Sequence, residues 1–459
     1  MKVSLWRRLA SGKRDLDMTE GNILQHIISF SIPLIAGLLL QQLYNMVDAW
    51  VVGNFVDGEA FSAVGTVGPI LNLLITFFTG LSSGVGVVIS QFYGIKDYES
   101  VSKTVHTSLL FTLILGVIFT GLGIAIVPPM LNLMNTPDEV FGAASEYLTI
   151  NFAGIMASML YNIGSGILRA VGDSKRPFYF LATSAITNTI LDLLFVIVFD
   201  MGVRGVALAT VIAEIVSVIL IIITIMRSDN CIKFVPRKLA IHWAILGKIL
   251  KVGLPTAIQM AVTSFSNIFV QSYINYFGTA AMGGWTAYAK IDQLVMLPTQ
   301  AISLASTTFV GQNLGHGDVK RAKKGVNISL IISVVTALII MIPIIAFAPH
   351  VVRFFNKEPE IVAFGTLFLH YLTPFYILCC VNQIYIGALR GAGNTTFPTI
   401  ISLCSYVGFR QIYLFIMANY VSNTVVPIAM GYPAGWILCF LVTIIYYRFT
   451  DLEKTRLVK

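Results

Sequence analysis

Long apolar stretches, separated by short polar segments, run through almost the whole chain. An α-helix needs about 20 residues to cross the hydrocarbon core of a membrane, and each of these stretches is at least that long. Twelve membrane helices are predicted, with limits near 27–53, 61–91, 104–127, 145–169, 177–199, 203–226, 246–278, 283–312, 326–347, 361–388, 398–419 and 425–448. The pattern therefore predicts an all-α membrane protein.

The second half of the chain repeats the first at a displacement of 221 residues. The segment SQFYGIKDYESVSKTV (90–105) aligns with GQNLGHGDVKRAKKGV (311–326), and GSGILRAVGDSKRPF (164–178) aligns with YIGALRGAGNTTFPT (385–399). Each repeat holds six predicted helices, an even number, so both repeats enter the membrane in the same orientation. Two homologous six-helix lobes are predicted.

These repeats divide the chain into two lobes and three cytoplasmic segments. The predicted divisions are an N-terminal segment at 1–26, an N-terminal lobe at 27–226, an inter-lobe linker at 227–245, a C-terminal lobe at 246–448 and a tail at 449–459. The linker is basic, and its charges are interpreted as a solvated face rather than a partner site.

Composition and charge placement both support a membrane location. Of the 459 residues, 56% are hydrophobic and 11% are charged, against about 25% charged in a typical soluble domain. The net charge of +8 does not indicate nucleic-acid binding, because 25 of the 30 Lys and Arg residues lie in or next to the predicted inner segments. The positive-inside rule then places both termini in the cytoplasm.

Several segments, taken together with the duplication, resemble one transporter family. They are PLIAGLLLQQLYNMVDAWVVGNF (33–55), LRAVGD (168–173) and LRGAGN (389–394). The chain resembles the multidrug and toxic compound extrusion (MATE) family, most closely the prokaryotic branch that includes proteins named for DNA-damage induction. The resemblance implies a V-shaped, monomeric, multi-pass transporter of a bacterial or archaeal plasma membrane. It also implies export of organic, often cationic drugs in exchange for Na⁺ or H⁺.

The resemblance also implies a cation site in the N-terminal lobe. Prokaryotic members place an acidic residue in the first helix, Asn and Asp four residues apart in the fifth, and Thr in the sixth. This chain has Asp48, Asn188, Asp192 and Thr210 at the matching positions, which could hold Na⁺ or a proton.

The depth of these residues supports the same site independently of the resemblance. Counted at 1.5 Å per residue, Asp48, Asp192 and Thr210 all lie roughly 8–10 Å below the outer ends of their helices. A carboxylate at the centre of a membrane helix costs roughly 3 kcal/mol, so such residues usually face the protein interior or a cavity. Carboxylates that share a dry pocket cannot all stay ionised, and such a site attracts a proton or a metal cation.

Other polar residues near this layer leave alternatives open. Glu214 lies one turn below Thr210 and either supports coupling or stabilises the lobe. Asp48 could instead hydrogen-bond Asn45, Gln41 or a neighbouring helix, as polar residues do when they join membrane helices. Pro33 is tolerated as a packing kink, or it bends the first helix during transport.

The C-terminal lobe carries a different set of charged and titratable side chains. Lys290, Asp292, His370 and Arg410 lie at about 10–14 Å of depth by the same count. An ion pair of Asp292 with Arg410 or Lys290 is the favoured interpretation, with substrate selection or lobe closure as the alternative. His370 is predicted to be a hydrogen-bonded helix histidine rather than a proton carrier.

Two further function classes were weighed. A flippase for lipid-linked saccharides would also show two six-helix lobes, but few basic residues lie deep in this chain. An enzyme is disfavoured because no phosphate-binding loop, zinc-binding histidine pair or nucleophile elbow is found. We therefore predict a multidrug antiporter with no cofactor other than the coupling ion, with small organic compounds and membrane lipids as its partners and no nucleic acid.

Overall fold

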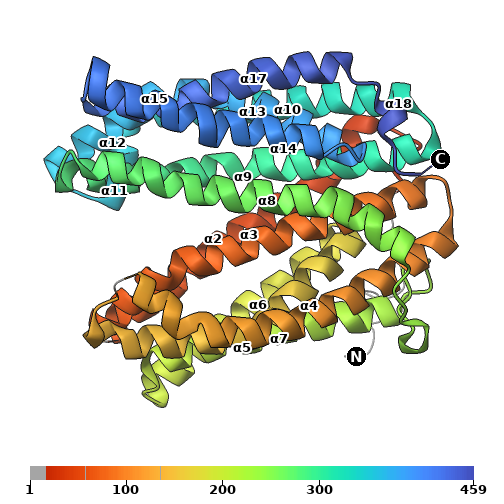
Figure 1. Cartoon of the computed structure of the whole chain (residues 1–459), viewed down its shortest axis with the longest axis horizontal. Helices are drawn as coiled ribbons and strands as arrows, with labels where there is room; N and C mark the ends of the chain where they lie inside the picture. Colours follow the sequence, from red (N-terminus) through yellow and green to blue (C-terminus); the bar gives the residue numbers. More distant parts are fainter. Residues whose placement is uncertain (1–16, 57, 135, 459) are drawn as a thin grey trace. The chain divides into compact units, whose positions relative to one another are not determined.

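The computed structural model describes residues 17–56, 58–134 and 136–458, apart from the side chains at 49, 58–62 and 66. Helices and short connections make up this part of the chain, and no strand occurs within it (Figure 1). Residues 1–16 of the predicted N-terminal segment and residue 459 of the predicted tail lie outside the described residues.

The first repeat forms six long helices and one π-helical turn. They are α2 (Ile23–Phe55), α3 (Gly58–Gly94), α4 (Tyr98–Leu133), α5 (Asp138–Ala170), α6 (Lys175–Leu193), η1 (Leu194–Val198, π) and α7 (Gly202–Met226). The linker that follows contains one 3₁₀ turn, η2 (Pro236–Lys238).

The second repeat has the same order of long helices but breaks them more often. Its elements are α8 (Trp243–Asn275), α9 (Thr279–His316), α10 (Val319–Ala346), α11 (Ala348–Phe355), α12 (Pro359–Leu372), η3 (Thr373–Phe375), α13 (Tyr376–Gly391), α14 (Thr396–Leu403), η4 (Cys404–Phe409, π), α15 (Arg410–Ile416), η5 (Met417–Val421, π), α16 (Val425–Ala429) and α17 (Gly431–Phe449). A short helix, α18 (Leu452–Thr455), ends the described chain.

All twelve predicted stretches are helical for most of their length, and eleven helical stretches are long and apolar enough to cross a membrane within the described residues. The predicted stretch 145–169, which lies in α5, is not among the eleven. Helix α5 packs against α3, α4 and α7, and buries polar residues such as Ser165. A helix covered by protein on several sides needs less apolar surface than one facing lipid.

The chain forms two compact units whose limits fall inside two helices. One unit comprises Ala36–Gly253, and the other combines Met18–Ile35 with the chain from Leu254 onward. Helices α2 and α8 are thus each divided, close to Pro33 and Pro255. These limits differ from the predicted lobes at 27–226 and 246–448, because the start of α2 packs with the second repeat and the linker packs with the first.

The segment before α2 is held in the second unit by side chains of α9 and of the start of α10. The Met18 N–H donates to Gln312 Oε1 at 3.0 Å, and the Met18 carbonyl accepts from Asn313 Nδ2 at 3.2 Å. Arg321 donates to the carbonyls of Met18 and Glu20 at 3.1 and 2.8 Å. Met18 itself is fully buried.

The linker is held in the first unit in a comparable way, by side chains of α4. The Val235 N–H donates to His106 Nε2 at 3.0 Å, while His106 Nδ1 donates to the Ser102 carbonyl at 2.7 Å. Thr107 Oγ1 bonds the backbone on both sides of the linker end, at Ala240 and His242. Both segments that lead into a first helix are therefore fixed by hydrogen bonds rather than by apolar contact alone.

A close backbone crossing joins α3 to the start of α8 within the first unit. A Cβ built on Gly84 would lie 2.5 Å from the Ile249 carbonyl oxygen and 2.6 Å from the Gly253 nitrogen. Small residues allow membrane helices to approach this closely. Only glycine fits at position 84 without movement of one helix.

Gly84→Ala is expected to lower the free energy of unfolding by about 1–3 kcal/mol, because the added methyl group has to push two backbones apart. The melting temperature of the purified protein in detergent measures this effect. Gly65→Ala is the matched control on the same helix, since a Cβ there meets nothing within 4 Å. Equal melting temperatures for the two variants would contradict the crossing.

Candidate functional site

The structure brings Asp48 of α2 and Asp192 of α6 together inside the first unit. Their carboxyl groups lie within hydrogen-bonding reach of each other. Asp192 is fully buried and Asp48 is partly buried. Two ionised carboxylates repel each other at such a distance, so the pair is stable only with a shared proton or a bound cation.

Asn188 and Thr210 form a second contact beside this pair. Asn188 lies one helical turn before Asp192 on α6, so both side chains share a face of that helix. The Asn188 Nδ2 donates to Thr210 Oγ1 of α7 at 3.4 Å, and Thr210 Oγ1 donates to the Val206 carbonyl at 3.1 Å. The four residues named by the resemblance therefore gather from three helices of one unit.

Several oxygens of this group lack a donor. Within the described residues, no hydrogen-bond donor reaches Asp48 Oδ1, Asn188 Oδ1 or either carboxylate oxygen of Asp192. Buried polar atoms are nearly always paired, so these four oxygens are available to a proton or a cation. Hard cations prefer carboxylate, amide and hydroxyl oxygens, and this donor set therefore fits Na⁺ as well as a proton.

In the described part of the chain, no three His, Cys, Asp or Glu side chains stand close enough together to hold a metal ion. A cation at this site would therefore draw on two carboxylates and on the uncharged oxygens of Asn188 and Thr210. Such a set carries a charge of −2 at most, and one bound proton or one Na⁺ brings it to −1.

Apolar side chains form one wall of the site. Val51 and Val52 follow Asp48 on α2, with 0% and 1% of their surface exposed. Val196 lies one turn beyond Asp192 in the π-helical segment η1, and Val206 lies one turn before Thr210. All four valines belong to one hydrophobic cluster of the first unit. Water is thus kept from this side of the carboxyl pair, which strengthens its electrostatic interactions.

Glu214 lies apart from the carboxyl pair and has its own partner. The Ser158 hydroxyl of α5 donates to Glu214 Oε1. Tyr147, also on α5, interacts electrostatically with Asp48, Asp192 and Glu214. Sequence reasoning did not select Tyr147 or Ser158, because no spacing pattern on α5 distinguishes them from packing residues.

The other candidates on α2 take no visible part in the pair. Asn45 is exposed and Gln41 is partly buried. Within the described residues, neither side chain donates a hydrogen bond to Asp48. Of the alternative partners of Asp48, only a neighbouring helix is in contact, through Asp192 of α6, so a role in joining helices stays open beside the coupling role. Pro33 lies two residues before Ile35, after which α2 passes from one unit to the other. This place suits a hinge, but the bending of α2 at Pro33 stays a prediction.

The predicted ion pair of Asp292 in the second unit is wrong. In the described part of the chain Asp292 has no ion pair with Arg410 or Lys290. Its carboxyl group instead lies within hydrogen-bonding reach of the Tyr376 hydroxyl, which is also 3.3 Å from the Tyr288 hydroxyl. Equal depth does not bring two residues together when they lie on different faces of their helices.

The other members of the predicted network are also separate. Lys290 is exposed, and His370 is exposed with its Nε2 3.1 Å from the Ile345 carbonyl, in line with the predicted hydrogen-bonded histidine. Arg410 is buried and donates to Ser266 Oγ and Asn267 Oδ1 at 2.8 and 3.0 Å. Within the described residues, no ion pair therefore joins any of the four, although Tyr432 interacts electrostatically with both Arg410 and Asp292.

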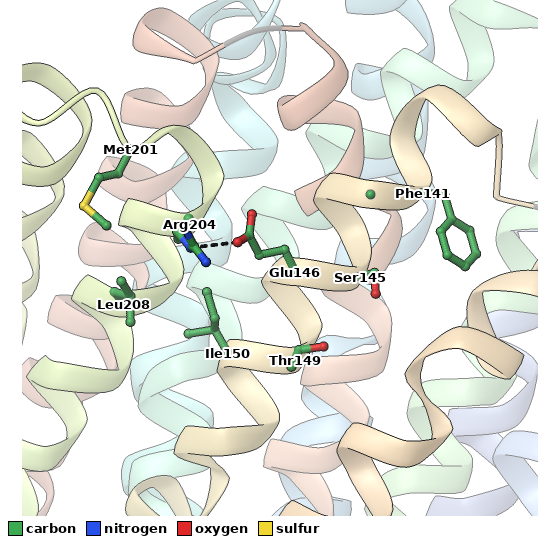
Figure 2. Close-up of a pocket in the computed structure, with 9 residues that line it drawn as sticks. Phe141, Ser145, Glu146, Thr149, Ile150, Met201, Arg204 and Leu208 are labelled. Atoms are coloured by element: carbon green, nitrogen blue, oxygen red, sulfur yellow. Dashed lines mark ion pairs between the residues drawn. The ribbon is translucent and has the colours of Figure 1, made fainter.

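An open cavity of about 730 Å³ lies between α5 and the start of α7, and neither Asp48 nor Asp192 lines it (Figure 2). Its lining residues are Phe141, Gly142, Ser145, Glu146, Thr149, Ile150, Met201, Arg204 and Leu208. Figure 2 shows Arg204 and Glu146 facing each other across it, with an Nε to Oε1 distance of 2.7 Å. The Arg204 side chain is 60% exposed and that of Glu146 is 43% exposed, and pairs at the surface contribute only about 0–1 kcal/mol.

Comparisons with known proteins identify the family of this chain. The family model MatE matches residues 33–194 and 255–416, one match in each repeat. The "Probable multidrug resistance protein YoeA" of Bacillus subtilis is 29% identical over 439 residues, covering 94% of this chain and 95% of that protein. The "Probable multidrug resistance protein NorM" of Thermotoga maritima is 26% identical over 442 residues, covering 94% of each.

A solved structure supports the fold. It is described as an outward-facing conformation of a multidrug resistance MATE family transporter of the MOP superfamily. It matches with a TM-score of 0.90 at 24% identity, over 97% of this chain and 99% of that one. Since the family model covers well over half of the residues, in two copies that follow the internal repeat, this chain belongs to the MatE family of membrane transporters.

Proposed function

We propose that this protein is a secondary antiporter that exports organic, often cationic and amphipathic compounds in exchange for H⁺ or Na⁺. The observation that carries the proposal is the apposition of Asp48 and Asp192, with four oxygens that lack a donor. The substrate class rests on the names of the relatives, which include multidrug resistance proteins. The expected location is a bacterial or archaeal plasma membrane, with both termini in the cytoplasm and a monomeric protein.

The carboxyl pair provides the chemistry of coupling. With neither proton nor cation, the two carboxylates repel and push α2 and α6 apart. A proton on one carboxyl group, or Na⁺ held by Asp48, Asp192, Asn188 and Thr210, removes that repulsion and joins the helices. An ion that binds one conformation more tightly than the other shifts the balance between them by that difference. Alternating access then follows from the two states of the site.

The divided helix α2 offers a route from the site to the rest of the chain. Asp48 lies in the part of α2 that belongs to the first unit, while residues up to Ile35 belong to the second. Proline interrupts the helical hydrogen bonds and permits a bend at Pro33. Ion loading at Asp48 would thereby act on a helix that is shared by both units.

Asp48→Asn is expected to reduce ion-driven efflux to the rate of protein-free vesicles, because an amide cannot exchange a proton or neutralise a cation. The measurement is efflux of a fluorescent organic cation from vesicles under an imposed pH gradient or an imposed Na⁺ gradient. Glu146→Gln is the matched control, since it removes a partly exposed carboxylate of the same unit whose partner is Arg204. Gradient-driven efflux retained by Asp48→Asn would refute the coupling role.

The same vesicles separate the proposal from its main alternative. If neither gradient moves the dye through folded, unaltered protein, drug export fails for this compound class. A flippase for lipid-linked saccharides then becomes the function to test. Of the two deep basic residues that such a substrate would use, Arg410 is buried and already donates to Ser266 and Asn267, which leaves only Lys290 exposed.

Glu214→Gln is expected to keep ion-driven efflux within a few-fold of the unaltered rate. An amide oxygen can still accept the hydrogen bond from Ser158, and Glu214 does not contact the Asp48 and Asp192 carboxyl groups. Efflux in the same vesicles gives the result. A loss as large as that of Asp48→Asn would extend the coupling site to Glu214.

A further inference from the structure

The second unit contains a buried arginine that ties three helices together. Arg410 is the first residue of α15 and is 2% exposed. Its Nη2 donates to Ser266 Oγ and Asn267 Oδ1 of α8, at 2.8 and 3.0 Å. Its guanidinium carbon lies 4.7 Å from the centre of the Tyr432 ring on α17. Among the described residues, no carboxylate forms an ion pair with Arg410.

The internal repeat shows what this arginine replaces. The two family-model matches are equally long, so residue 33 corresponds to 255 and residue 194 to 416, a displacement of 222. Pro33 and Pro255 are identical at this displacement, as are Asn45 and Asn267.

The displacement near residues 164–178 is one residue shorter, at 221. The π-helical segment η4 (Cys404–Phe409) lies between that region and Arg410. A π-helical turn bonds residue i to i+5 instead of i+4, and so holds one extra residue. The extra residue accounts for the change from 221 to 222.

At a displacement of 222, Asn188 corresponds to Arg410. Thr210 and Tyr432 lie beyond the two matches and correspond when the same displacement is continued past them. The contacts correspond too. Asn188 bonds Thr210 at 3.4 Å in the first unit, and Arg410 lies over the ring of Tyr432 in the second. This agreement between contacts supports the alignment without further use of sequence identity.

The two acids have apolar counterparts. Asp48 corresponds to Val270 and Asp192 to Leu414, and both counterparts are fully buried in one hydrophobic cluster. At these two positions the second unit therefore has no carboxylate, and the Asp292 carboxyl, which acts electrostatically on Tyr432, is bound to Tyr376 instead. The second unit carries a covalently attached positive charge there.

We propose that the Arg410 guanidinium is the fixed counterpart of the exchangeable cation in the first unit. Helices α8, α15 and α17 are held together permanently by Arg410, whereas α2, α6 and α7 are held together only while a proton or cation occupies the carboxyl pair. Arg410 is thus a positioning residue, and only the first unit responds to the coupling ion. This inference rests on the proposed antiport function.

Hydrogen exchange in the unaltered protein gives the first test. The probes are the coupling ions themselves, with Na⁺ added at fixed pH and pH lowered without Na⁺. One of the two ions is expected to slow amide exchange in 36–55 and to leave 254–275 unchanged. Ion-dependent protection of both segments would overturn the proposal, because the second unit would then hold an exchangeable site as well.

Arg410→Gln and Arg410→Lys give the second test, with Arg353→Gln as control for an exposed arginine of the same unit. Arg410→Gln removes two hydrogen bonds from a charged donor. Exchange in 254–275 is expected to rise about tenfold, the equivalent of about 1.4 kcal/mol, with or without the ion. The maximal efflux rate of Arg410→Gln should be several-fold lower than that of the unaltered protein. The ion concentration that gives half-maximal efflux should be the same in both. Arg410→Lys should lie closer to the unaltered protein.

Two outcomes in the variants would contradict a positioning role. A shifted ion concentration for half-maximal efflux in Arg410→Gln would place Arg410 in the ion chemistry itself. Unchanged exchange and unchanged efflux would show that it holds nothing in place. If Arg410→Gln does not fold, the proposal is tested by hydrogen exchange in the unaltered protein and by exchange and efflux in Arg410→Lys. Failure of the antiport function would be a different result. The unaltered protein would then show no efflux, while its amide hydrogen exchange in 36–55 and 254–275 would still follow the proposal.

Discussion

Two carboxyl groups in contact beside an apolar wall form the constraint on which the rest of this structure depends. Asp48 and Asp192 come from helices that are far apart in the sequence, and their contact is stable only when a positive charge joins them. Asn188 and Thr210 supply uncharged oxygens next to the pair, and buried valines keep water from one side of it. The proposed transport cycle follows from this one electrostatic requirement and its two states.

Because the chain is duplicated, the Asp48 and Asp192 site can be compared with the corresponding positions of the second repeat. Both repeats build the same sequence of long helices, and in both a segment before the first helix is fixed by hydrogen bonds. The chemistry at corresponding positions has nevertheless diverged. One unit has acids that require a cation, and the other has aliphatic side chains and a permanent arginine charge. In the proposed cycle, only the first unit responds to the ion, while Arg410 keeps the second unit rigid.

The sequence predicts the helices and the repeat well, because membrane helices leave long apolar stretches and duplication leaves matched glycines, arginines and prolines. A depth count also placed Asp48, Asp192 and Thr210 in one layer. The same count suggested the wrong pairing of Asp292 with Arg410 or Lys290, since depth says nothing about which face of a helix a residue occupies. The division of α2 and α8 between the units was missed, because repeats mark common ancestry rather than contacts. No sequence pattern marks Tyr147 as a site residue. Its place near Asp48, Asp192 and Glu214 is visible only in the structure.

Infrared difference spectroscopy on the purified protein tests the shared positive charge most directly, because a protonated carboxyl group and a carboxylate absorb at different frequencies. Spectra recorded at low and high pH, with and without Na⁺, are compared between the unaltered protein and Asp192→Asn, which leaves the signals of Glu214 and Asp292 in both. The account predicts a protonated-carboxyl band that disappears when pH rises or Na⁺ is added and that is missing from Asp192→Asn. Identical difference spectra for the two proteins would show that the Asp48 and Asp192 pair exchanges no proton or cation, and would contradict the account.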